Sequence, residues 1–214
     1  MSSKQDTDRW LEDVYHVSDR AALEQLYDSW ADSYDADLQQ VGYIHLPVIA
    51  GLVSRHVPDR AAAILDAGVG TGTIGEVLHL LGYSNLWGID MSEGMLAKAR
   101  ARGCYQDLRK GVLGEALDFA DGSFSGIVST GTFTKGHAPA VALVELARTL
   151  KPGGVLMFTV GTSIWEAQGF ADVTARLERD AVLVKIEETP AYAPMPFSPT
   201  ESGYLTKAHV YRKR

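Results

Sequence analysis

The chain has 214 residues, 46% of them hydrophobic and 22% charged, a balance typical of a single globular domain with a buried core. It carries 20 Lys and Arg residues against 27 Asp and Glu residues, and its net charge of -7 argues against a nucleic acid partner, because an acidic protein repels phosphates. The lone Cys104, the polar residues 1–10 and the shortness of every apolar run predict a cytoplasmic protein with no disulfide and no membrane partner.

The first expected elements are helices. In residues 19–35 the apolar and aromatic side chains recur at helical spacing and predict one amphipathic helix. A second helix is expected to follow Pro47 and to end before Pro58, because proline is tolerated in the first turn of a helix but not in its interior. We interpret residues 1–58 as an N-terminal helical extension that covers the main fold as a lid.

Strands and helices then alternate along the chain. Buried or alternating apolar runs predict strands at residues 62–65, 86–89, 109–113, 125–129, 155–160, 182–188 and 204–211. Helical patterns lie at residues 73–81, between Ser92 and Gly103, and at residues 139–150 and 163–179. This order predicts a Rossmann-like, doubly wound α/β sheet of seven strands over residues 59–214, mostly parallel with an antiparallel last strand.

A glycine-rich loop follows the first of these strands. Residues 70–75 read Gly-Thr-Gly-Thr-Ile-Gly, which matches the dinucleotide-binding fingerprint, and Asp90 has the offset of a ribose-binding acid. A nicotinamide-dependent oxidoreductase is therefore one open alternative. Asp66 argues against it, because a carboxylate there would face a pyrophosphate of like charge, whereas S-adenosylmethionine places an ammonium group in the same region.

Three segments carry a family resemblance. Residues 65–72 (Leu-Asp-Ala-Gly-Val-Gly-Thr-Gly) resemble the first motif of class I methyltransferases, residues 88–92 (Gly-Ile-Asp-Met-Ser) the second, and residues 150–154 (Leu-Lys-Pro-Gly-Gly) the turn before the fifth strand. Residues 27–35 and 131–139 are more narrowly similar to the Williams-Beuren syndrome region methyltransferase-like group. The resemblance covers the chain from residue 19 to its end and implies an S-adenosylmethionine-dependent methyltransferase.

The resemblance also implies roles for residues of the cofactor site. Asp90 is expected to accept both ribose hydroxyls, because a carboxylate can take two hydrogen bonds at once. Met91 is expected against the adenine face, with Met95 adding to that wall. The methionyl ammonium group is expected near Asp66 and at the backbone of Gly68, Ser129 and Thr130, and Gly70 is expected to bind the cofactor as part of the glycine loop.

The sequence departs from the family at the adenine site. Many relatives have an aspartate after the third strand, where the alignment places Leu113, followed by Gly114. We therefore expect adenine recognition to depend largely on backbone groups of this loop.

Two hydrophobic segments leave alternatives open. Tyr27, Trp30 and Tyr34 are either the buried face of a helix or, as the resemblance implies, part of a lid over the cofactor. Residues 190–199 hold four of the chain's 8 prolines and cannot form a helix or a central strand. They follow the sixth strand at the ligand edge of the sheet, as a second part of the lid or as a flap packed on a neighbouring helix.

His137 is the candidate general base, because it follows the fourth strand at the ligand edge and titrates near neutrality. It could equally be a hydrogen-bonding loop residue or a cofactor contact. No metal site is predicted, since Cys104 has no histidine at metal-ligand spacing. The sequence predicts methyl transfer by in-line displacement to an unidentified, small-molecule acceptor, and a non-catalytic S-adenosylmethionine-binding protein remains a second alternative.

Overall fold

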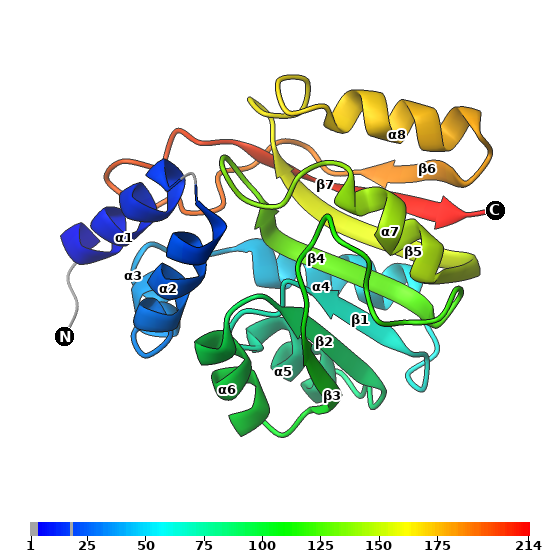
Figure 1. Ribbon diagram of the computed structural model, residues 1–214, viewed down its shortest axis with the longest axis horizontal. Coiled ribbons are helices and arrows are strands. Elements are labelled where there is room, and N and C mark those ends of the chain that lie inside the picture. The colour runs from blue at the N-terminus through cyan, green and yellow to red at the C-terminus, as the bar shows by residue number, and fades with distance from the viewer. Residues whose placement is uncertain (1–3, 18) are drawn as a thin grey trace.

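The computed structural model describes residues 4–17 and 19–214, so residues 1–3 of the expected N-terminal extension and residue 18 lie outside the described part of the chain. Its centre is a seven-stranded sheet of order β3-β2-β1-β4-β5-β7-β6 (Figure 1). The strands are β1 (Ile64–Ala67), β2 (Leu86–Asp90), β3 (Tyr105–Lys110), β4 (Phe124–Phe133), β5 (Leu150–Gly161), β6 (Leu183–Glu188) and β7 (Thr206–Lys213). Only β7 pairs antiparallel with its neighbours, β5 and β6. The predicted sheet with an antiparallel last strand is confirmed.

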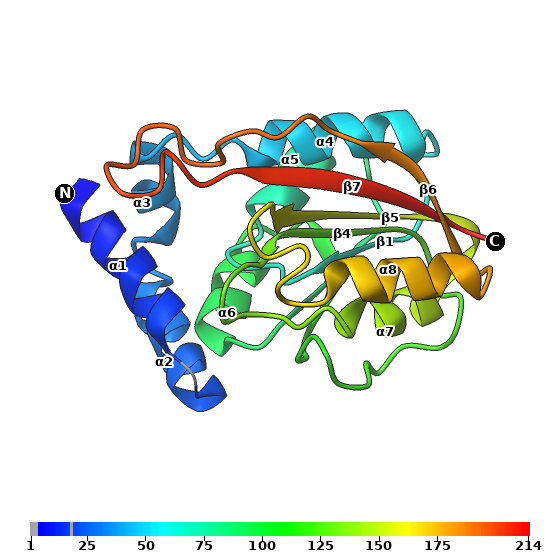
Figure 2. The ribbon, with the colours of Figure 1, turned by 90° about the horizontal axis from the view of Figure 1, so that it is seen from above.

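Helices cover both faces of this sheet (Figure 2). On one face lie α4 (His45–His56) and α5 (Thr73–Leu80), and on the other lie α7 (Ala142–Thr149) and α8 (Phe170–Arg179). Successive residues of a strand point to opposite faces, so Met157 of β5 packs in the cluster under α4 and Phe158 in the cluster under α7 and α8. The helix α6 (Glu93–Ala101) packs beside β2 and β3.

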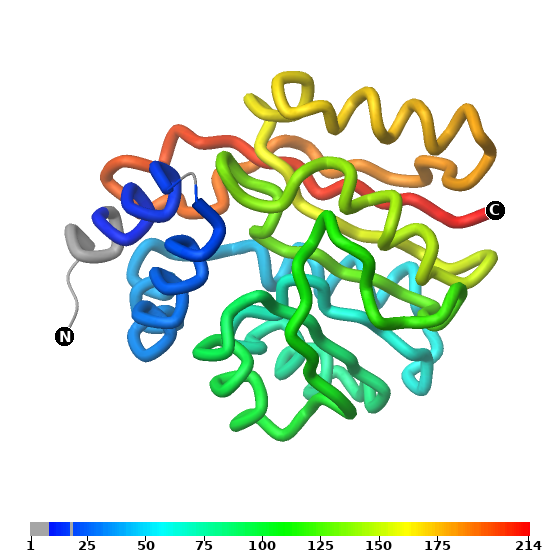
Figure 3. Tube along the Cα trace, viewed as in Figure 1, coloured from blue at the N-terminus to red at the C-terminus, as the bar shows by residue number. Residues whose placement is uncertain are grey.

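The remaining helices gather at one edge of the sheet. They are α1 (Lys4–His16), α2 (Arg20–Trp30) and α3 (Tyr34–Gln40), which we call the N-terminal helices. They face the edge to which the carboxyl ends of the parallel strands point (Figure 1). Residues 190–199, orange in Figure 3, run beside the N-terminal helices, which are blue. The helix α4, which is also part of the expected extension, packs instead on the sheet.

Two expected helices differ in the structure. The single helix expected over residues 19–35 is divided into α2 and α3, because buried Asp37 accepts hydrogen bonds from Trp30 Nε1 and Ser33 Oγ, both at 2.8 Å, and these fix a turn at residues 31–33. The helix α1 was not expected from its polar sequence. Its few apolar residues, among them Leu11 and Val14, are buried against the other N-terminal helices.

Later boundaries also moved. The third strand lies at residues 105–110 rather than 109–113, since residue 105 and residues 107–110 pair with β2 and the chain then leaves the sheet. The last helix begins at Phe170 rather than at residue 163, because residues 162–169 form turns. The cap predicted for α6 is confirmed, with Ser92 Oγ accepting the N–H of Met95 at 3.0 Å.

Candidate functional site

A cavity of about 460 Å³ lies between the carboxyl ends of the strands and the N-terminal helices. Its floor is built by the loops after β1, β2, β3 and β4, and Val17, Asp19, Arg20, Leu23, Tyr27 and Tyr34 contribute from the other side. Loops meet there because consecutive parallel strands end at the same edge of the sheet. The volume is in the range of small-molecule sites.

Most of the predicted site residues line this cavity. They are Tyr27, Tyr34, Gly68, Gly70, Asp90, Met91, Met95, Leu113, Gly114, Thr130 and His137. Trp30, Asp66 and Ser129 do not line it and are buried behind it, each at most 2% exposed.

The glycine loop is built for close approach of the backbone. Gly68 has φ +84°, and a Cβ there would lie 2.5 Å from Thr132 Oγ1, so a side chain is excluded by both conformation and space. The N–H of Gly70 donates to Asp90 Oδ2 at 2.8 Å. This hydrogen bond joins the glycine loop to the acid at the end of β2.

Asp90 presents its carboxylate to the cavity with part of its hydrogen-bonding capacity already used. Its Oδ2 accepts the N–H of Gly70, and its Oδ1 accepts the N–H of Ser92 at 2.9 Å. Each oxygen has two lone pairs, so each can accept one further donor from a ligand. Burial raises the pKa of Asp90, and the backbone hydrogen bonds oppose this shift.

Asp66 lies at the end of β1, beneath the glycine loop. Its Oδ2 accepts the hydroxyl of Tyr105 at 2.7 Å, and Tyr105 Oη also lies 3.4 Å from the carbonyl of Gly72. Its Oδ1 is buried and has no hydrogen-bond partner among the described residues. Burial raises the pKa of Asp66 to about 8, and a cation bound nearby would favour the charged form.

The end of β4 supplies polar groups from the opposite side of the glycine loop. Ser129 Oγ donates to the carbonyl of Ala67 at 2.8 Å, which ties β4 to β1 beneath the cavity. Thr130 lines the cavity, and its Oγ1 is buried with no hydrogen-bond partner within the described residues. An unsatisfied buried hydroxyl is costly, so this position fits a polar ligand group.

His137 and Tyr27 form a pair on the cavity wall. His137 Nδ1 lies 2.9 Å from the carbonyl of Lys135 and 2.8 Å from Thr134 Oγ1; because the carbonyl only accepts while the hydroxyl can donate or accept, we assign the proton of the neutral ring to Nδ1. The lone pair is then on Nε2, which accepts the hydroxyl of Tyr27 at 2.8 Å. Burial lowers the pKa of His137, so the ring is neutral at physiological pH.

The three aromatic residues of α2 and α3 separate into two groups. Tyr27 and Tyr34 line the cavity. Trp30 is 1% exposed, stacks on Trp10 with ring centroids 5.6 Å apart, and belongs to the core of the N-terminal helices. Trp30 therefore fits the buried face of a helix, and the lid role of Tyr27 and Tyr34 stays a prediction.

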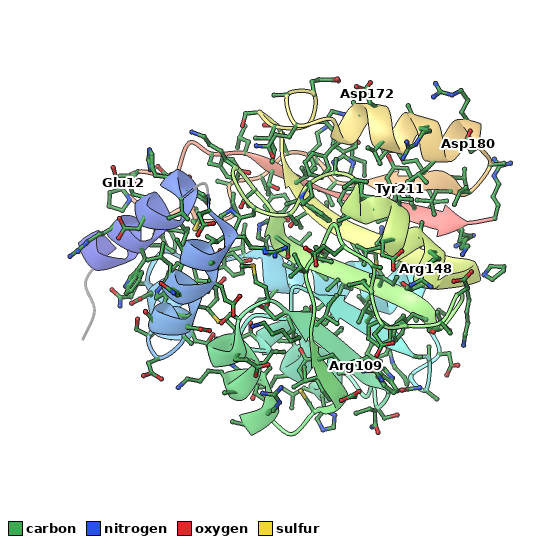
Figure 4. All side chains as sticks on the ribbon, in the orientation of Figure 1. Glu12, Arg109, Arg148, Asp172, Asp180 and Tyr211 are labelled. Carbon is green, nitrogen blue, oxygen red and sulfur yellow. The ribbon has the colours of Figure 1, made fainter. Side chains whose placement is uncertain are left out.

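Sequence reasoning missed an ion pair at the mouth of the cavity. Arg20, the first residue of α2, pairs with Glu115 of the loop after β3, and both line the cavity. The sign of this ion pair in the sequence was Glu115, an acidic residue two positions after Leu113. Arg148 of α7, labelled in Figure 4, holds the far part of this loop by donating to the carbonyls of Leu117 and Phe119.

The proline-rich segment lies behind the N-terminal helices rather than in the cavity wall. Tyr192 Oη lies 2.8 Å from His45 Nδ1, and the carbonyl of Pro194 accepts the N–H of Ile44. Met195 is 4% exposed and packs with Leu11, Val14 and Val41. These contacts favour the interpretation of a flap packed on neighbouring helices.

Comparisons with known proteins identify the family. A family profile described as a methyltransferase domain matches residues 65–158. Methyltransferase-like protein 27 of Homo sapiens is 34% identical over 169 residues, which cover 78% of this chain and 69% of that protein. The chain is a class I S-adenosylmethionine-dependent methyltransferase.

Further relatives of this methyltransferase have different named reactions. The malonyl-[acyl-carrier protein] O-methyltransferase of Erwinia pyrifoliae is 34% identical over 64% of this chain, which spans about half of that enzyme, 53%. The ubiquinone/menaquinone biosynthesis C-methyltransferase of Roseobacter denitrificans is 32% identical over 63% of this chain and 57% of its own length. Both oxygen and carbon acceptors thus occur among the relatives.

Solved structures agree with the fold of the methyltransferase. A TehB-like S-adenosylmethionine-dependent methyltransferase from Corynebacterium glutamicum superposes with a TM-score of 0.62 at 23% identity, covering 87% of this chain and 99% of its own.

Among the residues that the structure describes, no group of three or more His, Cys, Asp or Glu side chains could hold a metal ion. Within the same residues, every helix is too short or too polar to cross a membrane.

Proposed function

We propose that the methyltransferase binds S-adenosylmethionine in the 460 Å³ cavity and transfers its methyl group to a small-molecule acceptor. The observation that carries this proposal is the unit formed by Asp90 and the glycine loop. Two backbone N–H groups hold the carboxylate so that one lone pair of each oxygen remains for a neighbouring pair of ribose hydroxyls.

The other predicted cofactor residues have compatible places. Met91 and Met95 form an apolar wall beside Asp90, suited to one face of an adenine ring, and Leu113 and Gly114 lie in the loop after β3. We assign the ammonium group of the cofactor to the Gly68 carbonyl and to Thr130, whose hydroxyl lacks a partner within the described chain. Asp66 is buried behind the loop with a pKa raised to about 8, and the cofactor's ammonium group would favour its charged form.

S-adenosylmethionine, when bound, supplies a methyl group on a positively charged sulfur, which is displaced by a nucleophilic atom of the acceptor. The protein's main task is then to align the reactants and to exclude water. Tyr27 and Tyr34 line the cavity on the side of the N-terminal helices. We propose that these helices are the lid of a core that spans residues 59–214.

We propose that His137 takes up the proton that an acceptor hydroxyl or amine loses. Its Nε2 lone pair points to the hydroxyl of Tyr27, so the proton is passed through Tyr27. As the acceptor's proton moves to Tyr27 Oη, the proton of Tyr27 moves to Nε2, and the phenol is restored in one concerted shift. His137 ends as the imidazolium ion, which releases its proton to water.

Calorimetry and a labelling screen test this function. We expect S-adenosylmethionine and S-adenosylhomocysteine to bind, and NAD and NADP not to bind. A metabolite extract incubated with the protein and isotopically labelled methyl donor should yield a labelled small molecule, and His137→Ala should lower that yield more than it weakens cofactor binding. Comparable affinity for NAD would favour an oxidoreductase instead. Cofactor binding without any labelled product would favour a non-catalytic binding protein.

A further inference from the structure

Asp28 lies in α2 directly after the cavity residue Tyr27, on an exposed side of the helix, and its side chain reaches α6. Its Oδ1 accepts the N–H of Gly94 at 2.8 Å and the hydroxyl of Ser92 at 2.5 Å. The first turn of a helix has unpaired N–H groups and a partial positive charge, which a carboxylate satisfies. A residue of α2 therefore caps α6 from a distant part of the chain.

Ser92 connects this cap to the candidate cofactor site. Its hydroxyl donates to Asp28 and accepts the N–H of Met95 at 3.0 Å, while its own N–H donates to Asp90 Oδ1 at 2.9 Å. Residues 90–95 include the cavity residues Asp90, Met91 and Met95. One short segment thus carries the expected ribose ligand and the expected adenine wall, and Asp28 is hydrogen-bonded to Ser92 and Gly94 within it.

Gly94 allows α2 to come this close. A Cβ on Gly94 would lie 2.9 Å from Asp28 Cα and 3.1 Å from its carbonyl oxygen, both backbone atoms. Any larger residue would push α2 away from α6 and lengthen both hydrogen bonds to Asp28. The contact between α2 and α6 therefore depends on close backbone packing at Gly94 as well as on the rotamer of Asp28.

Other charged contacts join the same parts of the molecule without touching residues 90–95. Asp32, one turn further along, pairs with Lys98 at 2.6 Å on an exposed face. Asp35 pairs with Arg102 and accepts the hydroxyl of Thr71. These contacts attach the N-terminal helices, but among the described residues of those helices only Asp28 is hydrogen-bonded to the segment that carries Asp90.

We propose that Asp28 is a positioning residue for the cofactor site: it caps α6 in trans and so holds residues 90–95 in the conformation that binds adenosine. The proposal rests on the proposed function, since it takes Asp90 as the ribose ligand. It also gives residues 27–35 a joint role, in which Tyr27 faces the cavity and Asp28 fixes the segment opposite.

The test is calorimetric binding of S-adenosylhomocysteine to folded variants. Asp28→Ala removes both hydrogen bonds, and we expect about tenfold weaker binding, the usual effect of losing a helix cap. Asp28→Asn keeps an oxygen at Oδ1 that can accept both donors, so binding should stay within about threefold. The control Asp32→Asn removes a neighbouring link to α6 and should leave affinity unchanged.

A second pair of variants leaves every hydrogen-bonding group in place. Gly94→Ala should weaken binding about as much as Asp28→Ala, whereas Gly51→Ala, in α4 with no atom within 4 Å of the added Cβ, should not. The loss in Asp28→Ala should be equal for 5′-methylthioadenosine, which lacks the amino acid part, because the segment contacts only the adenosine.

The outcomes separate the two proposals. If the wild type binds neither ligand, the proposed function fails. If the wild type binds and Asp28→Ala retains its affinity, or if Asp28→Asn and Asp32→Asn lose as much as Asp28→Ala, the positioning role is refuted. Should Asp28→Ala not fold, wild-type affinity in Gly94→Ala refutes it equally.

Discussion

Replacing Asp90 by alanine tests the centre of the site. The carboxylate of Asp90 has one free lone pair on each oxygen, so two ribose hydroxyls can donate to it. A hydrogen bond to a charged group contributes about 1.5 to 3 kcal/mol. The loss of two such bonds should cost about 3 kcal/mol or more in binding, which is at least about a hundredfold in Kd.

The measurement is calorimetric titration of wild type and Asp90→Ala with S-adenosylhomocysteine. Asp107→Asn is the control, because Asp107 lies on the neighbouring strand β3 and pairs with Arg109 outside the cavity. Its affinity should equal that of the wild type. A loss below about threefold in Asp90→Ala would show that Asp90 is not the ribose ligand.

Two further measurements sharpen the same prediction. Asp90→Asn should not restore binding, because its amide group would turn its own N–H donors toward the N–H of either Gly70 or Ser92. Binding should also weaken as the pH falls. Burial raises the pKa of Asp90, so protonation, which removes acceptor lone pairs, begins at a higher pH than for an ordinary aspartate.

Three further measurements test Asp66, His137 and the segments that cover the site. Burial raises the pKa of Asp66 to about 8, so between about pH 4 and 8 the unfolded protein binds fewer protons than the folded one. The free energy of unfolding of the wild type, measured by denaturant titration, should therefore fall with rising pH relative to that of Asp66→Asn. Nitrogen NMR should find His137 neutral with its proton on Nδ1, and Tyr27→Phe should alter the Nε2 signal; a proton on Nε2 would show that the ring donates to Tyr27 and would refute the proposed proton path. Hydrogen exchange in residues 27–35 should slow with S-adenosylhomocysteine, whereas exchange in residues 190–202, which pack behind the N-terminal helices, should change little; unchanged exchange in residues 27–35 would refute the N-terminal lid.

Much of the fold could be predicted because its signals are local. The alternation of apolar runs, the glycine loop after β1 and the cap at Ser92 depend on neighbours within a few residues, and each lies in the structure close to its expected place. The boundary errors arise where packing overrides local propensity. The break between α2 and α3 depends on Asp37, whose partners Trp30 and Ser33 are only seven and four positions away, but which is buried by the packing of the N-terminal helices.

The candidate site divides in the same way. Asp90, Met91 and the glycine loop follow strands whose ends must meet at one edge of a parallel sheet, so the sequence alone determined that they lie together. Which residues face them was decided by tertiary structure. Tyr27 meets His137 across 110 positions, and Asp28 meets Gly94 across 66, because α2 crosses α6 where a glycine leaves room for its backbone. Local spacing does not encode that crossing, since it arises from packing between helices far apart in the chain.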